Sequence, residues 1–220
     1  MNPVAVSRFL DVGNSVKSDK MNEGYQWFYP RFLGSFRSTP IRLLEIGYRR
    51  GHSARLWRRY LPKATLSFMD KRYPPGGSGA VVEGIKFHLK DQTIYQDNLD
   101  VCREDGPFDL VVDDGAHTMV AIRTSMTALL SCVKPGGFYI VEDLHTAYGD
   151  QVPGQKYFGG GLHSSNSVMN IFKDLIDVVN RKRFNSSFTV VPGDELVTGI
   201  FCFKSACILE VGSHARDVYA

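Results

Sequence analysis

Two carboxylates and an imidazole follow a short apolar segment in the middle of the chain. The segment reads FDLVVDDGAH from Phe108 to His117, and its last acidic residues are Asp113 and Asp114. A run such as LVV, apolar at every position, predicts a strand buried on both faces, as in a parallel sheet. Such a strand delivers the residues after it to the carboxyl edge of the sheet, where open α/β folds bind ligands. We therefore expect a functional site at this edge.

A second segment of the same form reads GFYIVEDLH and ends in Glu142, Asp143 and His145. If the two strands are neighbours about 4.8 Å apart, Asp114 converges with Glu142 and Asp143. Carboxylates this close repel one another unless a cation holds them, and Mg²⁺ prefers carboxylate and water oxygens. We therefore predict a site for Mg²⁺ or another divalent cation, with Asp114, Glu142 and Asp143 as ligands. The alternative is that these acids only cap turns and helix N-termini.

His117 follows Asp114 by three residues, with a glycine between them. An imidazole side chain titrates close to neutral pH, which suits a general base, and we assign this catalytic role to His117. The alternative is a histidine that orients a carboxylate. His145 lies only two residues past Asp143, which favours a structural or loop-anchoring role.

The elements that would position these residues have the pattern of an α/β protein. Short apolar runs predict strands, and apolar residues at helical spacing predict helices between them. The expected strands lie at 41–46, 65–69, 85–89, 108–113 and 137–141, and the expected helices at 53–61, 98–104, 118–133 and 167–180. Residues 197–203 and 206–211 predict a closing antiparallel hairpin. This ending is typical of the Rossmann-like class I methyltransferase fold, a mostly parallel seven-stranded α/β sheet with helices on both faces.

The ends of the earlier strands predict a cofactor site. Glu45 ends the first strand, and the turn GYRRG after it lacks the G-x-G-x-x-G spacing of a phosphate-binding loop. A carboxylate there would repel a pyrophosphate and suits a positively charged ligand. S-adenosylmethionine is such a ligand, because it carries an ammonium and a sulfonium group.

Each predicted cofactor contact has a specific role. We expect Gly47 to allow close backbone approach and Asp70 to accept from the ribose hydroxyls. Asp91 or Gln92 is expected near the adenine. Side chains alternate along a strand, so Asp113 is expected to face the cofactor rather than the metal. The full predicted cofactor-binding set is Glu45, Gly47, Ser53, Asp70, Asp91, Gln92 and Asp113.

Length and composition are those of one globular domain. The 220 residues are 43% hydrophobic and 22% charged, with a net charge of +3, which argues against disorder and gives little preference for nucleic acid. Residues 1–40 predict an aromatic, helical lead-in that either packs on the domain or covers the ligand cleft. Residues 41–220 are expected to form the methyltransferase domain, with the loop 146–166 as a substrate lid.

Cysteine use and hydropathy predict a soluble, reducing, cytoplasmic location. No cysteine pair has C-x-x-C spacing, and we expect four buried free thiols, although Cys202 and Cys207 could face each other across the hairpin. No apolar run approaches the ~20 residues of a membrane span, and the N-terminus lacks the apolar block of a signal peptide. We attribute a glycosylation sequon at 185–187 to chance.

The motifs EIG, FDLVVDDGAH and VKPGGFYIVEDLHTAY together resemble the metal-dependent sugar O-methyltransferases of macrolide and polyketide biosynthesis, of the mycinamicin and rhamnosyl tetracenomycin type. The resemblance covers about residues 18–211. It implies S-adenosylmethionine and Mg²⁺ as cofactors. It also implies Asp114, Glu142 and Asp143 as metal ligands and His117 as the base.

The sequence departs from this family in two ways. The first is Arg49 and Arg50 in the turn after the first strand, where relatives commonly have more glycine. The second is length, because the chain is too short to hold the large N-terminal domain of the macrolide enzymes as well. The substrate specificity and oligomer contacts of that domain are therefore not transferred.

The expected function is methyl transfer to a hydroxyl, in a sugar or vicinal diol, of a small-molecule natural product. The alternatives are a methyltransferase for a catechol or RNA, and a non-catalytic methyltransferase-like binding protein. The basic runs RRGHSARLWRRYLPK and 181–183 lack a clear pattern of stacking aromatic residues, so we expect no nucleic-acid partner. We also expect no membrane partner, and the sequence leaves open whether the chain forms a homo-oligomer.

Overall fold

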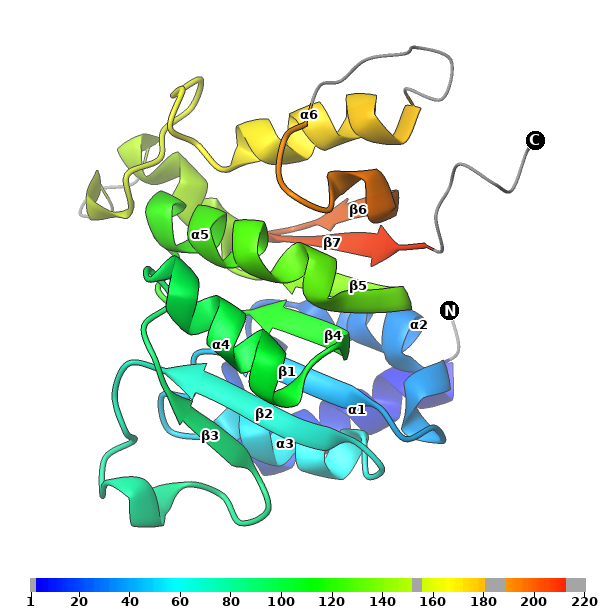
Figure 1. Ribbon diagram of the computed structural model, residues 1–220. Helices are drawn as coiled ribbons and strands as arrows, with labels where there is room; N and C mark the ends of the chain where they lie inside the picture. The colour runs from blue at the N-terminus through cyan, green and yellow to red at the C-terminus, as the bar shows by residue number, and fades with distance from the viewer. Residues whose placement is uncertain (1–2, 152–155, 181–188, 213–220) are drawn as a thin grey trace.

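Seven strands form one sheet in the order β3-β2-β1-β4-β5-β7-β6 (Figure 1). The computed structural model describes residues 3–151, 156–180 and 189–212. The strands are β1 (Arg42–Ile46), β2 (Thr65–Asp70), β3 (Lys86–Leu89), β4 (Phe108–Asp113), β5 (Val133–Val141), β6 (Val197–Phe203) and β7 (Ala206–Val211). Strands β1 to β5 pair in parallel, and β7 lies antiparallel between β5 and β6. The predicted mostly parallel sheet with a closing hairpin is confirmed.

The strand register brings the predicted site residues to one edge of the sheet. Strand β4 is buried along its length except at Asp109, as expected for a central strand. Ile46 of β1 pairs with Asp113 of β4, and Asp113 pairs with Val141 of β5. The amide of Glu142 donates to the carbonyl of Asp113 at 3.0 Å. The residues that follow β4 and β5 therefore lie side by side, as predicted.

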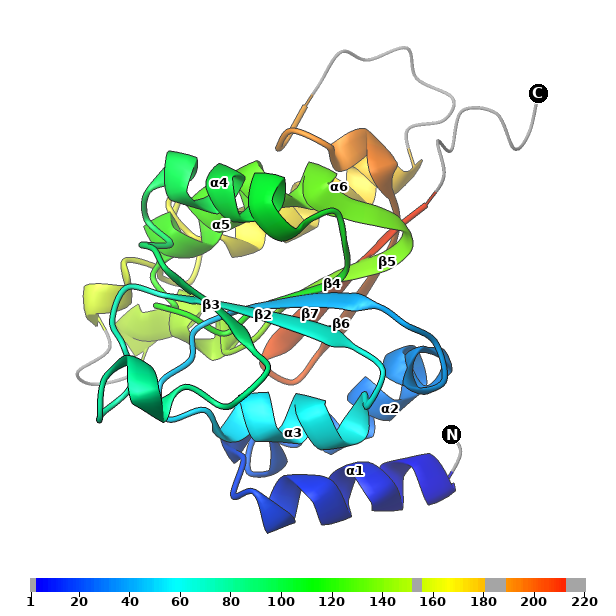
Figure 2. The same cartoon turned by 60° about the horizontal axis from the view of Figure 1, so that its bottom comes forward.

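Helices cover both faces of the sheet (Figure 2). One face carries α4 (Tyr95–Asp105), α5 (Met119–Leu129) and α6 (Met169–Asn180), and the other carries α1 (Pro3–Ser15), α2 (Tyr29–Leu33) and α3 (His52–Tyr60). Each face buries its own cluster of apolar side chains. Helix α5 begins just after the candidate base, where the hydroxyl of Thr118 accepts from the amide of Ala121 at 3.2 Å.

Helix α5 ends earlier, and β5 begins earlier, than the sequence predicts. The helix ends at Leu129, a 3-10 turn covers Leu130–Cys132, and β5 starts at Val133. The residues KPGG were expected to separate helix and strand, but they lie inside β5. The pairing of β5 with β4 shifts register at Phe108, and a bulge of this kind accommodates the extra residues.

The N-terminal segment packs into the core on the α3 side of the sheet. Phe9 of α1 is fully buried, with its ring centroid 4.8 Å from that of Tyr60 and 5.6 Å from that of Tyr29. Phe28 and Trp57 are buried in the same cluster. These aromatic residues of the lead-in therefore pack on the domain beside α3, while Lys17 and Asp19 of the same segment line the cavity at the carboxyl edge of the sheet.

All four cysteines form disulfides, so the prediction of free thiols is wrong. Cys102 near the end of α4 bonds to Cys132 just before β5, with a Cα–Cα distance of 6.1 Å. Cys202 and Cys207 are register partners across the β6–β7 hairpin. The first pair is 30 residues apart in sequence, and only the packing of α4 beside α5 brings its members together.

The predicted lid at 146–166 contains short helical turns. Two 3-10 segments cover Leu144–Gln151 and Lys156–Phe158, and the amide of Gly161 donates to the carbonyl of Ala147 at 2.7 Å. Residues 152–155 of this loop, the basic run 181–183 and the sequon at 185–187 lie outside the described residues. Among the helices that the structure describes, none has the length and apolarity to cross a membrane.

Candidate active site

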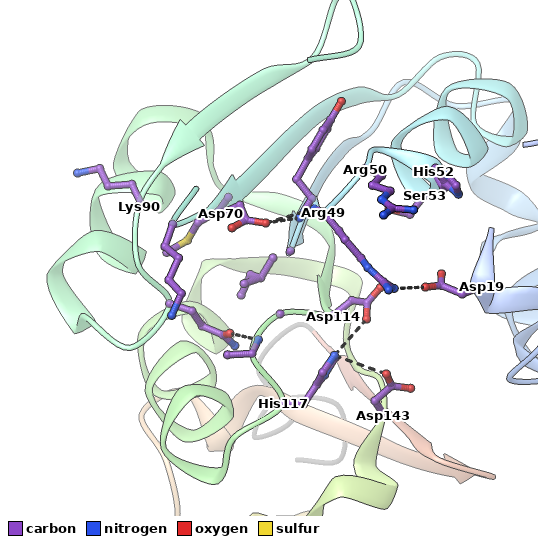
Figure 3. A pocket seen from close by; sticks show the side chains of 18 of the residues that line it. Asp19, Arg49, Arg50, His52, Ser53, Asp70, Lys90, Asp114, His117 and Asp143 are labelled. Carbon is purple, nitrogen blue, oxygen red and sulfur yellow. Dashed lines mark hydrogen bonds and ion pairs between the residues drawn. The ribbon is translucent and has the colours of Figure 1, made fainter. Parts of the chain in front are cut away.

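A cavity of about 640 Å³ opens at the carboxyl edge of the sheet (Figure 3). Its walls are the lead-in at Lys17 and Asp19, the turn after β1 and the start of α3, the ends of β2 and β3, the turn after β4 and the first residues after β5. The predicted site residues that line it are Gly47, Ser53, Asp70, Asp91, Gln92, Asp114, His117 and Asp143. The other three, Glu45, Asp113 and Glu142, are buried and do not line it.

Gly47 allows the turn after β1 to touch the turn after β4. Its φ is +96°, and a Cβ at this position would lie 2.2 Å from the carbonyl oxygen of Asp114. Both the left-handed backbone and the close approach require glycine. The close approach that Gly47 permits is to the backbone at Asp114, and its predicted role beside the cofactor stays a prediction.

Asp70 fastens the turn after β1 to the end of β2. Its Oδ2 accepts from the amides of Tyr48 at 2.9 Å and Arg49 at 3.2 Å. The guanidinium of Arg49 extends to Asp19 of the lead-in at 3.1 Å (Figure 3). Both side chains of this pair are largely exposed, so it adds little stability. The arginine that departs from the family pattern thus points along the cavity mouth rather than into the sheet.

Asp113 lies behind the cavity and does not face it, contrary to the prediction. It is 1% exposed and accepts from the amide side chain of Gln92 at 2.7 Å and from the hydroxyl of Ser125. Burial raises the pKa of Asp113, although these donors oppose the shift. The Oε1 of Gln92 in turn accepts from the amide of Ala116 at 2.9 Å. Asp113 therefore orients Gln92, which does line the cavity.

Asp114, His117 and Asp143 meet at the floor of the cavity (Figure 3). The Nε2 of His117 lies 3.8 Å from Oδ1 of Asp114 and 3.5 Å from Oδ2 of Asp143. His117 and Asp143 both have φ of +54°, a left-handed conformation that costs energy in residues other than glycine and often marks functional sites. The hydroxyl of Thr146 donates to the carbonyls of both residues, at 3.1 and 2.8 Å. Tyr25 donates to the other oxygen of Asp143 at 2.8 Å.

These three side chains have the chemistry of a divalent-cation site. Each offers one ligand atom, and these atoms all lie within 4.8 Å of one another. Carboxylate oxygens suit Mg²⁺ and Mn²⁺, and imidazole suits several transition metals. The residues present therefore fit a divalent cation, with Asp114 and Asp143 as its oxygen ligands.

Glu142, the third predicted ligand, turns into the protein instead. It is 1% exposed, its Oε2 accepts from the ammonium of Lys20 at 2.6 Å, and its Oε1 accepts from the hydroxyl of Tyr29. Lys20 also lies 2.7 Å from Oδ2 of Asp114 and 3.2 Å from Oε1 of Glu45. Glu142 faces the lead-in, whereas Asp143, whose backbone is left-handed with φ of +54°, reaches the cavity.

The buried charges around Lys20 have shifted pKa values. Burial alone would lower the pKa of Lys20, but Asp114, Glu142 and Glu45 together raise it well above its ordinary value. Burial raises the pKa of Glu45 to about 7, against the opposing effect of Lys20. Burial also raises the pKa of Glu142. Lys20 therefore stays charged, and Glu45 and Glu142 hold their protons more tightly than exposed carboxylates do.

Glu45, predicted to contact a positively charged cofactor, does not line the cavity and instead lies against the ammonium of Lys20. Its second oxygen accepts from the indole N–H of Trp57 at 2.5 Å. Lys20 is the main site residue that the sequence reasoning missed. The available signal was a lysine directly before a segment of buried aromatic residues, beside strand ends with a surplus of carboxylates.

His145 lies next to the cluster of Asp114, His117 and Asp143 and lines a second cavity of about 390 Å³. Its Nδ1 is 2.6 Å from the hydroxyl of Ser205 at the tip of the β6–β7 hairpin and 4.0 Å from Oδ1 of Asp143. This contact is consistent with the anchoring role that the sequence favours for His145.

No protein-family model matches the chain. It is 32% identical over 210 residues to mycinamicin VI 2''-O-methyltransferase of Micromonospora griseorubida, covering 84% of this chain and 48% of the relative. It is 30% identical over 207 residues to demethylmacrocin O-methyltransferase of Streptomyces fradiae, covering 86% and 50%. The chain thus spans about half the length of these curated relatives.

Solved structures show the same relationship. The MycE methyltransferase of mycinamycin biosynthesis, in complex with Mg, SAH and mycinamycin VI, superposes with a TM-score of 0.76 at 29% identity, covering 87% of this chain and 49% of that one. The SAH-bound Podospora anserina methyltransferase PaMTH1 has a TM-score of 0.52 at 14% identity and supports the fold alone. The chain has the class I methyltransferase fold and is a homologue of the sugar O-methyltransferases of macrolide and tetracenomycin biosynthesis.

Proposed function

We propose that the chain catalyses methyl transfer from S-adenosylmethionine to a hydroxyl of a small-molecule natural product, in a sugar or vicinal diol, with the help of a divalent cation. The observation that carries this proposal is the cluster of Asp114, His117 and Asp143 on the floor of a cavity at the carboxyl edge of the sheet. The homologous enzymes act on sugar hydroxyls, which supports the acceptor class.

The part of the cavity between β1 and β3 would hold the cofactor. Asp70 retains acceptor capacity for ribose hydroxyls while it fastens the turn after β1. Asp91 and Gln92 follow β3 and line the wall where a base could lie. The volume of about 640 Å³ is within the ordinary range for small-molecule sites. S-adenosylmethionine supplies a methyl group on a positively charged sulfur.

Asp114 and Asp143 would hold the cation beside the acceptor. A divalent cation there lowers the pKa of a nearby hydroxyl. The two carboxylates are fixed from behind, Asp114 by Lys20 and Asp143 by Tyr25. Each therefore keeps one oxygen directed toward the cavity, which is the arrangement that leaves space for substrate oxygens and water.

His117 would accept the hydroxyl proton. Its Nε2 lies 3.5 Å or more from both carboxylates, beyond an ordinary hydrogen bond, so its lone pair can face the acceptor. The acceptor oxygen would receive the methyl group that S-adenosylmethionine supplies, which leaves S-adenosylhomocysteine, and the hydroxyl proton would go to Nε2 of His117. Asp143 stabilises the imidazolium that results. The turns at 144–166 would exclude water from this step.

The test is transfer of a labelled methyl group from S-adenosylmethionine to a panel of glycosides. His117→Ala should lower kcat by about 10²- to 10⁴-fold, the usual contribution of a general base. Its control is Arg123→Ala, because Arg123 is exposed on α5 and lines neither cavity. Asp114→Ala and EDTA treatment should each abolish turnover, and added Mg²⁺ should restore only the EDTA-treated protein. Methyl transfer that survives both treatments refutes the metal-assisted mechanism. If calorimetry with S-adenosylmethionine shows no heat of binding, the result favours the non-catalytic binding protein.

A further inference from the structure

The ammonium of Lys20 joins the ends of three strands. It contacts Glu45, the penultimate residue of β1, at 3.2 Å, Asp114 just after β4 at 2.7 Å and Glu142 just after β5 at 2.6 Å. Lys20 is 1% exposed, and its ammonium also lies 5.9 Å from the ring centroid of Trp57. A buried charge without partners is strongly unfavourable, and three carboxylates around one ammonium are well beyond what its burial requires. The ammonium of Lys20 therefore also offsets the repulsion among the three carboxylates.

Lys20 divides the acidic residues of this edge into two groups. Glu45 and Glu142 lie behind the ammonium and away from the cavity. Asp143 lies in front of it and faces His117. Asp114 belongs to both groups, because Oδ2 contacts Lys20 while Oδ1 faces His117 at 3.8 Å. The lysine thus occupies the place between Asp114 and Glu142 that a cation bound by both would need.

We propose that Lys20 is a resident cation of the active site, a positioning residue that withholds Glu142 from the metal and limits the divalent cation to the outer carboxylates of Asp114 and Asp143. This inference rests on the proposed metal centre and adds what sets its ligand number and affinity. A fixed positive charge behind Asp114 repels a divalent cation in front of it and offsets part of the carboxylate charge. The site therefore binds its metal less tightly than the number of nearby acids suggests.

The experiment measures binding of Mn²⁺ by calorimetry and by the electron paramagnetic resonance of free Mn²⁺, without cofactor or acceptor. In Lys20→Met, Glu142 loses its partner and becomes available as a ligand. We expect the variant to bind Mn²⁺ at least about tenfold more tightly than the wild type, because the number and charge of carboxylate ligands set the affinity of oxygen sites. Adding Glu142→Gln to this variant should remove the gain. Lys20→Arg, which keeps the charge, should stay near the wild type.

The outcomes separate this inference from the proposed function. Binding of Mn²⁺ to the wild type with unchanged affinity in Lys20→Met overturns the role of Lys20 and leaves the metal-assisted reaction standing. Binding by Lys20→Met alone refutes metal assistance and overturns the inference as well, because Lys20 would then replace the divalent cation in the wild type rather than limit its ligands. An absence of binding in both proteins overturns both.

A second pair of variants keeps the test decisive if Lys20→Met fails to fold. In the wild-type background, Glu142→Gln should change Mn²⁺ affinity by less than about threefold, whereas Asp143→Asn should lower it by about tenfold or more. The two acids are consecutive in the chain and differ in which side of Lys20 they face. Equal losses in both variants would show that Glu142 binds the metal directly and would overturn the inference.

Discussion

Glu45→Gln should make the free energy of unfolding less dependent on pH between about pH 4.5 and pH 8. Glu45 is fully buried, and burial raises its pKa from 4.5 to about 7 in the folded protein. Glutamine keeps the shape of the side chain and an oxygen that accepts from the indole of Trp57. The substitution therefore removes the titration while it preserves the hydrogen bond at this position.

The sign and size of the effect follow from linkage. The folded state holds the proton of Glu45 more tightly than the unfolded state, so its contribution to stability is complete below about pH 4.5 and is lost as pH rises through about 7. The two pKa values differ by about 2.5, and each pKa unit corresponds to about 1.36 kcal/mol. The wild type should therefore lose up to about 3 kcal/mol relative to Glu45→Gln between pH 4.5 and pH 8.

The assay is urea unfolding of both proteins at several pH values in EDTA, followed by tryptophan fluorescence. The quantity that decides is the difference in the free energy of unfolding between the variant and the wild type at each pH. Glu83→Gln serves as the matched control, because Glu83 is exposed and its substitution should leave this difference constant. A constant difference for Glu45→Gln as well would refute the buried-carboxyl argument.

Three further perturbations test other parts of the structure. Phe9→Ala should lower the free energy of unfolding by about 3–5 kcal/mol in a single transition followed by far-UV circular dichroism, and an unchanged midpoint would contradict a shared core. Reduction of the Cys102–Cys132 disulfide, whose members are 30 residues apart, should lower the free energy of unfolding by about 3–4 kcal/mol, because the unfolded chain regains the entropy of an open loop. Cys102→Ser already lacks this disulfide, so dithiothreitol should not lower its free energy of unfolding by this amount. An equal loss in the variant would show that the effect comes from the Cys202–Cys207 disulfide. Asp70→Ala frees the turn after β1 and should weaken binding of S-adenosylhomocysteine by about tenfold or more in calorimetry, the equivalent of ~1.4 kcal/mol; unchanged affinity would remove Asp70 from the cofactor site.

The sheet and the location of the site could be predicted from the sequence because the signals are local. An apolar run such as Leu110 to Val112 is buried wherever the strand lies, and helical spacing of apolar residues is visible within a dozen positions. Acidic residues that end parallel strands must share one edge, whatever the details of packing. The convergence of Asp114 with Asp143, and the place of His117 beside them, follow from that rule.

The direction of individual side chains at this edge was decided only by tertiary structure. Glu142 and Asp143 are adjacent just beyond β5, and one side chain turns inward while the other reaches the cavity, but the sequence does not say which. The choice depends on Lys20, which is 122 residues away in sequence from Glu142 and 94 from Asp114. The disulfide between Cys102 and Cys132 likewise depends on how two helices lie side by side.

Composition and period thus determined which strands exist and what gathers at their ends, since those signals act over a few residues. Tertiary structure decided which acids are exposed to a ligand and which are neutralised inside, since a buried charge must find its partner wherever the chain brings one. In this protein the partner is a single lysine from the N-terminal segment, and it determines which acids are left to face the cavity.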